Sequence, residues 1–531
     1  MTVSTRRAFL MGAGAAVAAA TDARSRGGTA PLNAVQVPAS EWDYCTITEL
    51  VDALRTRKIS ALELTDRAIA RIECVDRSVN AVIVRDFERA RDAARAADAA
   101  LMRGETRALL GVPITVKESF DIAGLPTTWG DPRFRRFMPK EDALVVARVK
   151  NAGAAILGKT NVPLLLSDWQ TYNDIYGTTN NPWDLRLTPG GSSGGSAAAL
   201  ACGFGPLSLG SDLGGSLRAP AHYCGVYAHK PTLGVVPRRG QTPPGTPPFA
   251  RDSDFAVVGP MARSAADLAL ALDLVAGPDE QRAGVGYRLA LPAPRRDQLQ
   301  DFRVLVIDAH PLAPTSAVVK AALGRLTERL VRAGVKVAHA SPLLPDLAES
   351  ARLYARLLSA YWGAGLPPGE YARLGRKAST LAPDNRSLAA ERMRGAVMSH
   401  RDWLAAESER ALLQQQWREL FREWDVVLCP VMPTPAFPHD HSSPIEARHI
   451  RIDGESCSYL DAQTVWAELA TTPGLPATAA PIDRSEHGLP IGVQIIGPHL
   501  EDRTTIAFAR FLEQRFGGFA PPPTCSQSTA Q

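Results

Sequence analysis

A lysine and two serines are the residues of this sequence best suited to nucleophilic chemistry. Lys117 follows the apolar run 112–116, so it is well placed to be buried. Burial lowers the pKa of a lysine, and only the neutral form can take a proton from a serine hydroxyl. Ser192 and Ser216 stand among glycines, which can turn backbone N–H groups toward a developing oxyanion. These residues predict acyl transfer by a serine that a lysine activates.

Two other motifs offer different chemistry in the same region. Residues 153–160 match the phosphate-loop pattern G-x-x-x-x-G-K-T, and residues 191–195 match the G-x-S-x-G nucleophile elbow. Each motif requires a strand directly before it. A helical pattern precedes residue 153, however, and residues 186–190 have no strand pattern. We therefore interpret residues 153–160 as part of a buried strand and favour neither alternative.

Short apolar strands alternate with helices around these residues. We expect strands at 112–116, 154–157 and 206–209, and helices at 143–151 and 195–202. Further helices are expected at 87–101, 264–275, 318–333 and 347–423, two helices within 46–72, and strands at 303–307, 335–338 and 425–428. This alternation predicts an α/β fold.

The glycine-rich segments 190–199 and 210–220 resemble the signature of the amidase signature family. Segment 111–118 is similar to the lysine-bearing strand of that family. Ordered matches extend from about residue 45 to 515 and include the segments 157–161, 176–182, 229–232, 259–264 and 488–494. The resemblance implies a single large α/β domain, with a mixed β-sheet core flanked by helices.

The resemblance also implies a role for each residue of the site. Ser216 would be the acylated nucleophile, Ser192 the bridging serine in a cis peptide, and Lys117 the terminal base. The oxyanion-hole amides would come from Ser216 and from the three residues before it, Leu213, Gly214 and Gly215. The residues that brace the glycine-rich loops would be Ser193, Asp212 and Arg218.

Amide hydrolysis is the activity that this resemblance implies. Lys117 would accept the Ser216 proton through Ser192, and hydrolysis of the acyl-enzyme would release an acid after the amine or ammonia has left. Hydrolysis of a carbamate or an ester on the same three residues is an alternative. Two further alternatives are an inactive binding protein on the same scaffold and a glutamine-hydrolysing amidotransferase subunit.

The expected substrate is a small amide with an apolar or aryl group. Four residues that flank the family elements are candidates to line its pocket, although core packing would explain them equally: Trp129, Leu166, Trp169 and Tyr172. No motif predicts an organic cofactor or a metal, and we interpret His439 and His441 as loop residues that bind no metal. The oligomeric state is left open, a homodimer included.

The N-terminus resembles a bacterial twin-arginine export signal. Arg6 and Arg7 precede a small-residue apolar run, from Gly12 to Ala20, that is too short to span a bilayer. The expected division of the chain is a signal peptide at 1–20, a linker or N-terminal arm at 21–40, the amidase catalytic domain at 41–520 and a C-terminal tail at 521–531. The protein would then be periplasmic or secreted, with the twin-arginine machinery as its export partner.

The overall composition excludes several classes of protein. Of the 531 residues, 45% are hydrophobic and 21% are charged, which excludes a disordered chain and a multi-span membrane protein. The formal net charge of +4 includes the two arginines of the signal, so no basic face for nucleic acid is expected. The seven cysteines are scattered without a C-x-x-C pair, and we expect no disulfide framework.

Overall fold

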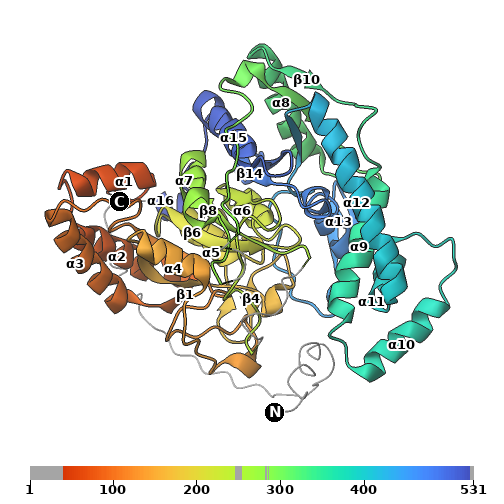
Figure 1. Cartoon of the computed structure of the whole chain (residues 1–531), viewed down its shortest axis with the longest axis horizontal. Helices are drawn as coiled ribbons and strands as arrows, with labels where there is room; N and C mark the ends of the chain where they lie inside the picture. The colour runs from red at the N-terminus through yellow and green to blue at the C-terminus, as the bar shows by residue number, and fades with distance from the viewer. Residues whose placement is uncertain (1–39, 246–253, 282–283, 285, 527–531) are drawn as a thin grey trace, which may run out of the picture.

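Strands from both halves of the chain form one large mixed sheet (Figure 1). The computed structural model describes residues 40–245, 254–281, 284 and 286–526. The strands of the sheet within these residues are β1 (Val82–Arg85), β2 (Pro113–Lys117), β3 (Ala155–Thr160), β6 (Leu207–Asp212), β7 (Tyr227–Lys230), β8 (Val257–Ala262), β9 (Arg303–Val306), β10 (Lys336–Ala338), β11 (Val426–Pro430), β14 (Ala477–Arg484) and β15 (Pro490–Ile496).

The order of these strands places β2 and β6 side by side. The full order is β1-β3-β2-β6-β8-β7-β14-β15-β11-β9-β10. Parallel pairs join β2 to β3 and β6, and join β9 to β10 and β11. The remaining pairs are antiparallel. Two small hairpins lie outside the sheet, formed by β4 (Tyr172–Asn173) with β5 (Gly177–Thr178) and by β12 (His449–Ile452) with β13 (Glu455–Ser458).

Helices flank the sheet. In chain order they are α1 (Ile47–Arg55), α2 (Ala61–Val79), α3 (Phe87–Met102), α4 (Leu144–Asn151), α5 (Gly194–Ala201), α6 (Arg218–Cys224), α7 (Ala265–Val275), α8 (Ala317–Arg332), α9 (Leu347–Gly363), α10 (Pro368–Ser379), α11 (Leu388–Ala396), α12 (His400–Glu423), α13 (Tyr459–Thr464), α14 (Glu468–Thr471), α15 (Asp502–Phe516) and α16 (Pro523–Ser526). Figure 1 shows α1–α4 on one side of the molecule and α9–α12 on the other.

The architecture confirms the predicted α/β class and many of the predicted elements. The two helices expected within 46–72 are α1 and α2. Each begins with a capping box, in which a hydroxyl and a glutamate three residues later satisfy each other's backbone N–H groups. Residues 155–160 form the buried strand β3, in agreement with our interpretation of the segment that matches the phosphate-loop pattern.

Two predicted segments differ from the structure. Strand β6 continues past the predicted end at residue 209 to Asp212, because it pairs with β8 as far as Val257. The helical segment 347–423 is divided into α9, α10, α11 and α12. Pro367 and Pro383 lie between the first three of these helices, where a proline cannot continue a helix.

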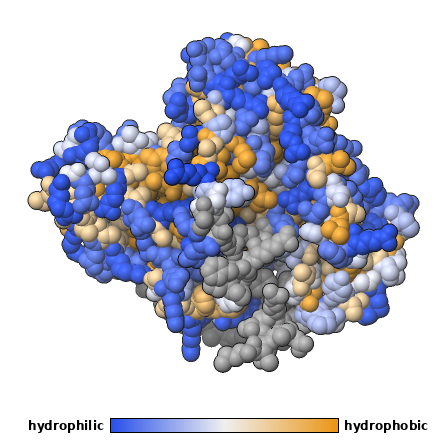
Figure 2. Space-filling model, in the orientation of Figure 1, coloured by the Kyte–Doolittle hydropathy of each residue, from blue (hydrophilic) through white to orange (hydrophobic). Residues whose placement is uncertain are grey.

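The central strands are covered on both faces. Strands β2, β3, β6 and β11 are buried along their whole length. Figure 2 shows polar residues over much of the periphery of this face and apolar residues gathered toward its middle. Among the described helices, none has the length and apolarity that crossing a membrane requires. The predicted signal peptide at 1–20 lies outside the described residues.

Helix α5 packs tightly at its first turn. All eight of its residues are buried. A Cβ atom on Gly195 would lie 2.4 Å from the backbone N of Asn161, and one on Gly194 would lie 2.2 Å from Thr171 Oγ1. The absence of side chains at these two positions therefore allows the start of α5 to lie against the chain that follows β3.

Candidate active site

Lys117 ends β2, is fully buried and contacts three serine hydroxyls. Its Nζ lies within hydrogen-bond distance of the Oγ atoms of Ser192 (2.7 Å), Ser193 (2.9 Å) and Ser211 (3.0 Å). Ser192 and Ser193 directly precede α5, and Ser211 lies on β6, the strand beside β2. The close packing of α5 and the pairing of β2 with β6 thus bring these four side chains together.

The surroundings of Lys117 favour its neutral form. Burial lowers the pKa of Lys117 well below the ordinary lysine value, and the charge of Asp212 opposes this only in part. The three hydrogen-bond partners of its Nζ are hydroxyls rather than carboxylates. A lysine held in this way is available as a proton acceptor.

The backbone of Ser192 is held by close packing. The peptide bond between Gly191 and Ser192 is cis. A Cβ atom on Gly191 would lie 2.4 Å from the backbone O of Asp168, so glycine is required for this approach. Asp168 is itself fixed by a buried ion pair with Arg448 (2.6 Å).

Ser216 lies on the loop between β6 and α6 and is half-buried. Its carbonyl accepts a hydrogen bond from Ser193 N–H (3.2 Å), which joins this loop to the one that carries Ser192. The Gly215 N–H donates to Asp212 Oδ1 (2.8 Å) and is therefore already used. Within the described residues, the N–H groups of Gly214 and Ser216 have no acceptor.

A buried ion pair fixes the same loop. Arg218 donates through Nε and Nη2 to the two carboxylate oxygens of Asp212 (3.0 and 2.8 Å). Burial alone would raise the pKa of Asp212, but the Arg218 guanidinium lowers it to about 2. The ionised carboxylate also accepts the N–H groups of Gly215 and Leu217, the two neighbours of Ser216 (2.8 and 3.0 Å). Asp212 and Arg218 therefore contact each other and the backbone on both sides of Ser216.

Two aromatic side chains hold carbonyl groups of this loop. Trp169 Nε1 donates to Gly214 O (2.8 Å), and the Tyr354 hydroxyl donates to Leu213 O (2.9 Å). In a trans peptide the carbonyl and the following N–H point in opposite directions. Tyr354 thus fixes the direction of the unused Gly214 N–H.

The sequence matches a known family over most of its length. Residues 63–506 match the family described as Amidase. The chain belongs to the amidase signature family. A glutamyl-tRNA(Gln) amidotransferase subunit from Anaeromyxobacter sp. (strain K) is 34% identical to this amidase over 510 residues, which cover 92% of this chain and all of the relative.

Two further comparisons describe the range of the family. Fatty-acid amide hydrolase 2-A of Danio rerio is 31% identical to this amidase over 500 residues, which cover 89% of each chain. The crystal structure of a bacterial aryl acylamidase has a TM-score of 0.74 at 23% identity and covers 90% of this chain and 97% of that one. This structural likeness concerns the fold alone.

The four candidate pocket residues of the amidase have different contacts. Trp169 is half-buried and contacts the Ser216 loop directly, and a pocket role for the other three stays a prediction. Trp129 is buried and donates from its ring to Ser119 O (3.1 Å), so it supports the chain after β2. The Tyr172 hydroxyl bonds to the Asp168–Arg448 pair, and Leu166 is half-buried in the turn Leu164–Leu166.

Three residues that touch the amidase site were not predicted from the sequence. Ser211 contacts Lys117, and Gln241 Nε2 donates to Ser211 Oγ (3.2 Å) and Ser119 Oγ (3.3 Å). Tyr354 belongs to the distant helix α9. Ser211 directly precedes Asp212 inside the segment 210–220 that resembles the family signature, so its position could have predicted a place in the site. No pattern in the sequence points to Gln241 or Tyr354.

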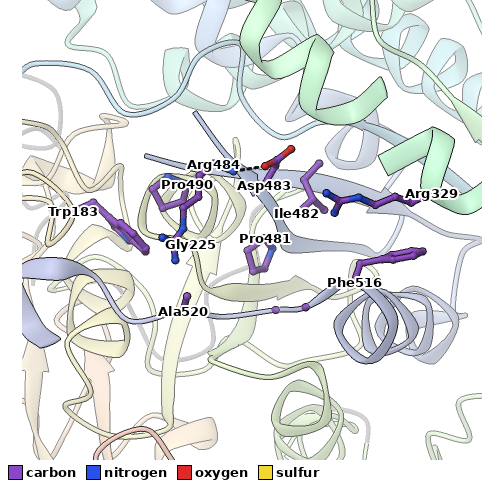
Figure 3. A pocket seen from close by; sticks show the side chains of 12 residues that line it. Trp183, Gly225, Arg329, Pro481, Ile482, Asp483, Arg484, Pro490, Phe516 and Ala520 are labelled. Atoms are coloured by element: carbon purple, nitrogen blue, oxygen red, sulfur yellow. Dashed lines mark hydrogen bonds between the residues drawn. The ribbon is translucent and has the colours of Figure 1, made fainter. Parts of the chain in front are cut away.

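A surface groove of about 380 Å³ lies apart from these residues (Figure 3). Its lining includes Trp183, Arg329, Asp483 and Arg484, and none of the predicted site residues. In the part of the chain that the structure describes, no three His, Cys, Asp or Glu side chains gather as metal ligands.

We expect the variant Arg218→Gln to lower the free energy of unfolding by about 3–5 kcal/mol, because it leaves a carboxylate buried without a cation. The folded pKa of Asp212, about 2, lies below the value of about 4 in an unfolded chain. Its stabilising effect is therefore complete above pH 4 and is lost as the pH falls through 2. The stability difference between the two proteins should narrow over that range in denaturant titrations.

The exposed Arg422, whose side chain is 78% accessible, supplies the control Arg422→Gln, which should stay close to wild type. Equal stabilities of wild type and Arg218→Gln at pH 7 would contradict the role given to this ion pair.

Proposed function

We propose that this amidase hydrolyses carboxylic amides by forming an acyl-enzyme on Ser216. The observation that carries the proposal is the buried Lys117 with its Nζ 2.7 Å from Ser192 Oγ. A neutral amine has two N–H donors and one lone pair. Three hydroxyl neighbours match that set when the Ser192 O–H points at the lone pair. Lys117 then acts as the base, and Ser192 carries the proton between it and Ser216.

The proposed reaction begins when Ser216 Oγ attacks the amide carbonyl carbon. The Ser216 proton passes to Ser192 while the Ser192 proton passes to Lys117. The N–H groups of Gly214 and Ser216 stabilise the oxyanion. The proton returns along the same path to the leaving nitrogen, the C–N bond breaks, and water hydrolyses the acyl-enzyme.

This assignment of oxyanion donors is narrower than the one that the family resemblance implies. We leave Gly215 out because its N–H is bonded to Asp212, whereas the part of Leu213 in the oxyanion hole stays a prediction of the resemblance. Its part is instead to tie the loop to that carboxylate, so that the N–H groups on each side of it stay free for the substrate.

We further propose that the substrate carries an apolar or aryl group. Trp169 lies beside Gly214 and Gly215 and packs edge-on against Tyr459, with ring centroids 6.0 Å apart. Aromatic rings at this position favour an apolar group next to the scissile bond. The 31% identity to a fatty-acid amide hydrolase agrees with this proposal.

Glutamine hydrolysis is a second candidate function. The observation in its favour is the 34% identity to the amidotransferase subunit from Anaeromyxobacter over 92% of the chain. Carbamates and esters would use the same three catalytic residues, so the substrate panel described below includes them.

Removing any of the three proposed catalytic residues should nearly abolish turnover and labelling by a serine-directed fluorophosphonate. We expect Ser216→Ala, Ser192→Ala and Lys117→Ala each to lose about 10³-fold or more in rate, since the three act as one unit. The exposed Ser379 on α10 gives the control Ser379→Ala, which should label normally. Wild-type turnover in any folded variant of the three would refute the assignment.

A substrate panel should separate the candidate functions. We expect anilides and long-chain amides to give the highest kcat/KM, with free glutamine, carbamates and esters below them and Ser216→Ala as the blank. Release of ammonia from glutamine without hydrolysis of any apolar amide would overturn the substrate proposal and leave the acyl-enzyme proposal standing.

We also propose that the protein is exported through the twin-arginine route. The support is Arg6 and Arg7 followed by the apolar run from Gly12 to Ala20. In a bacterium with that route, the wild-type chain should reach the periplasmic fraction and the double variant Arg6→Lys, Arg7→Lys should stay in the cytoplasm. Equal distribution of the two would count against export by this route.

A further inference from the structure

Two cysteines far apart in the sequence are in direct contact. Cys202 caps the C-terminal end of α5, and Cys525 lies in the C-terminal helix α16. Their Sγ atoms are 2.6 Å apart, although 323 positions separate them in the chain. Both side chains are buried. The two sulfurs therefore already lie close to the S–S bond length of about 2.05 Å that a disulfide requires.

One buried arginine holds the backbone of both cysteines. Arg71 on α2 donates through Nε to Cys202 O (2.5 Å) and through Nη2 to Cys525 O (2.7 Å). Its Nη1 is paired with Asp43 (3.1 Å). Arg71 therefore fixes the distance between the two chain segments, independently of the sulfur atoms.

Non-covalent contacts also hold the segment that carries Cys525. Tyr44 donates from its hydroxyl to Cys525 O (3.3 Å) and packs against Phe519, with ring centroids 5.7 Å apart. The Thr524 hydroxyl donates to Pro182 O. Pro523 and Thr524 are exposed, whereas Cys525 points into the protein. A covalent bond at Cys525 would add to these non-covalent contacts of the segment.

Other cysteines have different surroundings. Cys45 and Cys224 donate to backbone carbonyls, and Cys429 accepts from Gln494 Nε2. Cys202 and Cys525, by contrast, contact each other through their sulfur atoms. The sequence alone predicts no disulfide, because the two residues form no recognisable spacing.

We propose that Cys202 and Cys525 form an intramolecular disulfide under oxidising conditions and so attach the C-terminal segment to the end of α5. Both cysteines are free thiols in this structure. The oxidant is a small dialkyl disulfide such as oxidised glutathione, or a protein disulfide of the same class.

The exchange proceeds in two balanced steps. The hydrogen bond from Cys202 lowers the pKa of the Cys525 thiol, so Cys525 is the first nucleophile. When local opening of the C-terminal segment exposes Cys525, its thiolate attacks one sulfur of the external disulfide and expels the other as a thiolate. Cys202 then loses its proton, attacks Cys525 Sγ and expels the second external thiolate. Two cysteine thiols are oxidised by two electrons, and one external disulfide is reduced to two thiols.

The bond would close a very long loop. Cross-linking distant residues restricts the unfolded chain, and the restriction grows with the length of the loop that is closed. The bond also fixes the far end of α5, whose beginning follows Ser192 and Ser193. We expect its effect to appear in stability, since the proposed catalytic residues keep their contacts in either redox state.

The test uses the full-length purified protein, either treated with oxidised glutathione or reduced with dithiothreitol. Non-reducing peptide mapping should show a Cys202–Cys525 cross-linked peptide in the oxidised sample, and the number of titratable thiols should fall by two. The oxidised protein should melt roughly 2–6 °C higher than the reduced protein. Cys525→Ser should abolish this redox difference, and the control Cys457→Ser should retain it.

Two results would overturn the proposal. One is recovery of unlinked Cys202 and Cys525 peptides after oxidation of the wild-type protein, which needs no variant and so does not depend on whether Cys525→Ser folds. The other is a redox difference in melting temperature that persists in folded Cys525→Ser. Neither result depends on turnover, so the amide hydrolase proposal is tested separately.

Discussion

The burial of Lys117 among hydroxyl groups is the constraint on which the rest of the site depends. A buried ammonium needs an anion close by, and the nearby anion is Asp212 on the adjacent strand. Asp212 is committed to Arg218, which occupies both of its oxygens. The charges of Asp212 and Arg218 compensate each other, so Lys117 is left with the serines Ser192, Ser193 and Ser211.

The ion pair between Asp212 and Arg218 also determines the conformation of the Ser216 loop. The carboxylate that pairs with Arg218 also binds the amides of Gly215 and Leu217. Tyr354 and Trp169 bind carbonyls on the preceding peptides. Arg218 extends the arrangement to α14 through Ala467 O and Thr471 Oγ1. Residues from four distant parts of the chain thus hold the direction of two unused N–H groups.

Local sequence patterns predicted much of this architecture. The parts that they did not predict depend on contacts between distant segments. The capping residues Thr46 and Ser60 and the apolar run before Lys117 are local signals, and α1, α2 and β2 follow them closely. The length of β6 depended on its partner β8, so the sequence predicted a shorter strand. Tyr354 and Gln241 reach the site only through tertiary packing. A short-range sequence pattern contains no information about such packing. The use of the Gly215 N–H by Asp212 depends on loop conformation, which residue types alone do not determine.

The first turn of α5 sets a limit on how this protein can evolve. A single methyl group at residue 194 or 195 would collide with Thr171 or with the backbone at Asn161. Mutations at these two codons are therefore confined to silent ones unless the chain after β3 moves as well. New substrate preferences have to arise elsewhere, in segments such as the α9 helix and the loop of Trp169. Those segments lie outside α5, β2 and β6, so selection can alter them while the proton relay keeps its geometry, provided that Tyr354 and the backbone at Asp168 stay in place.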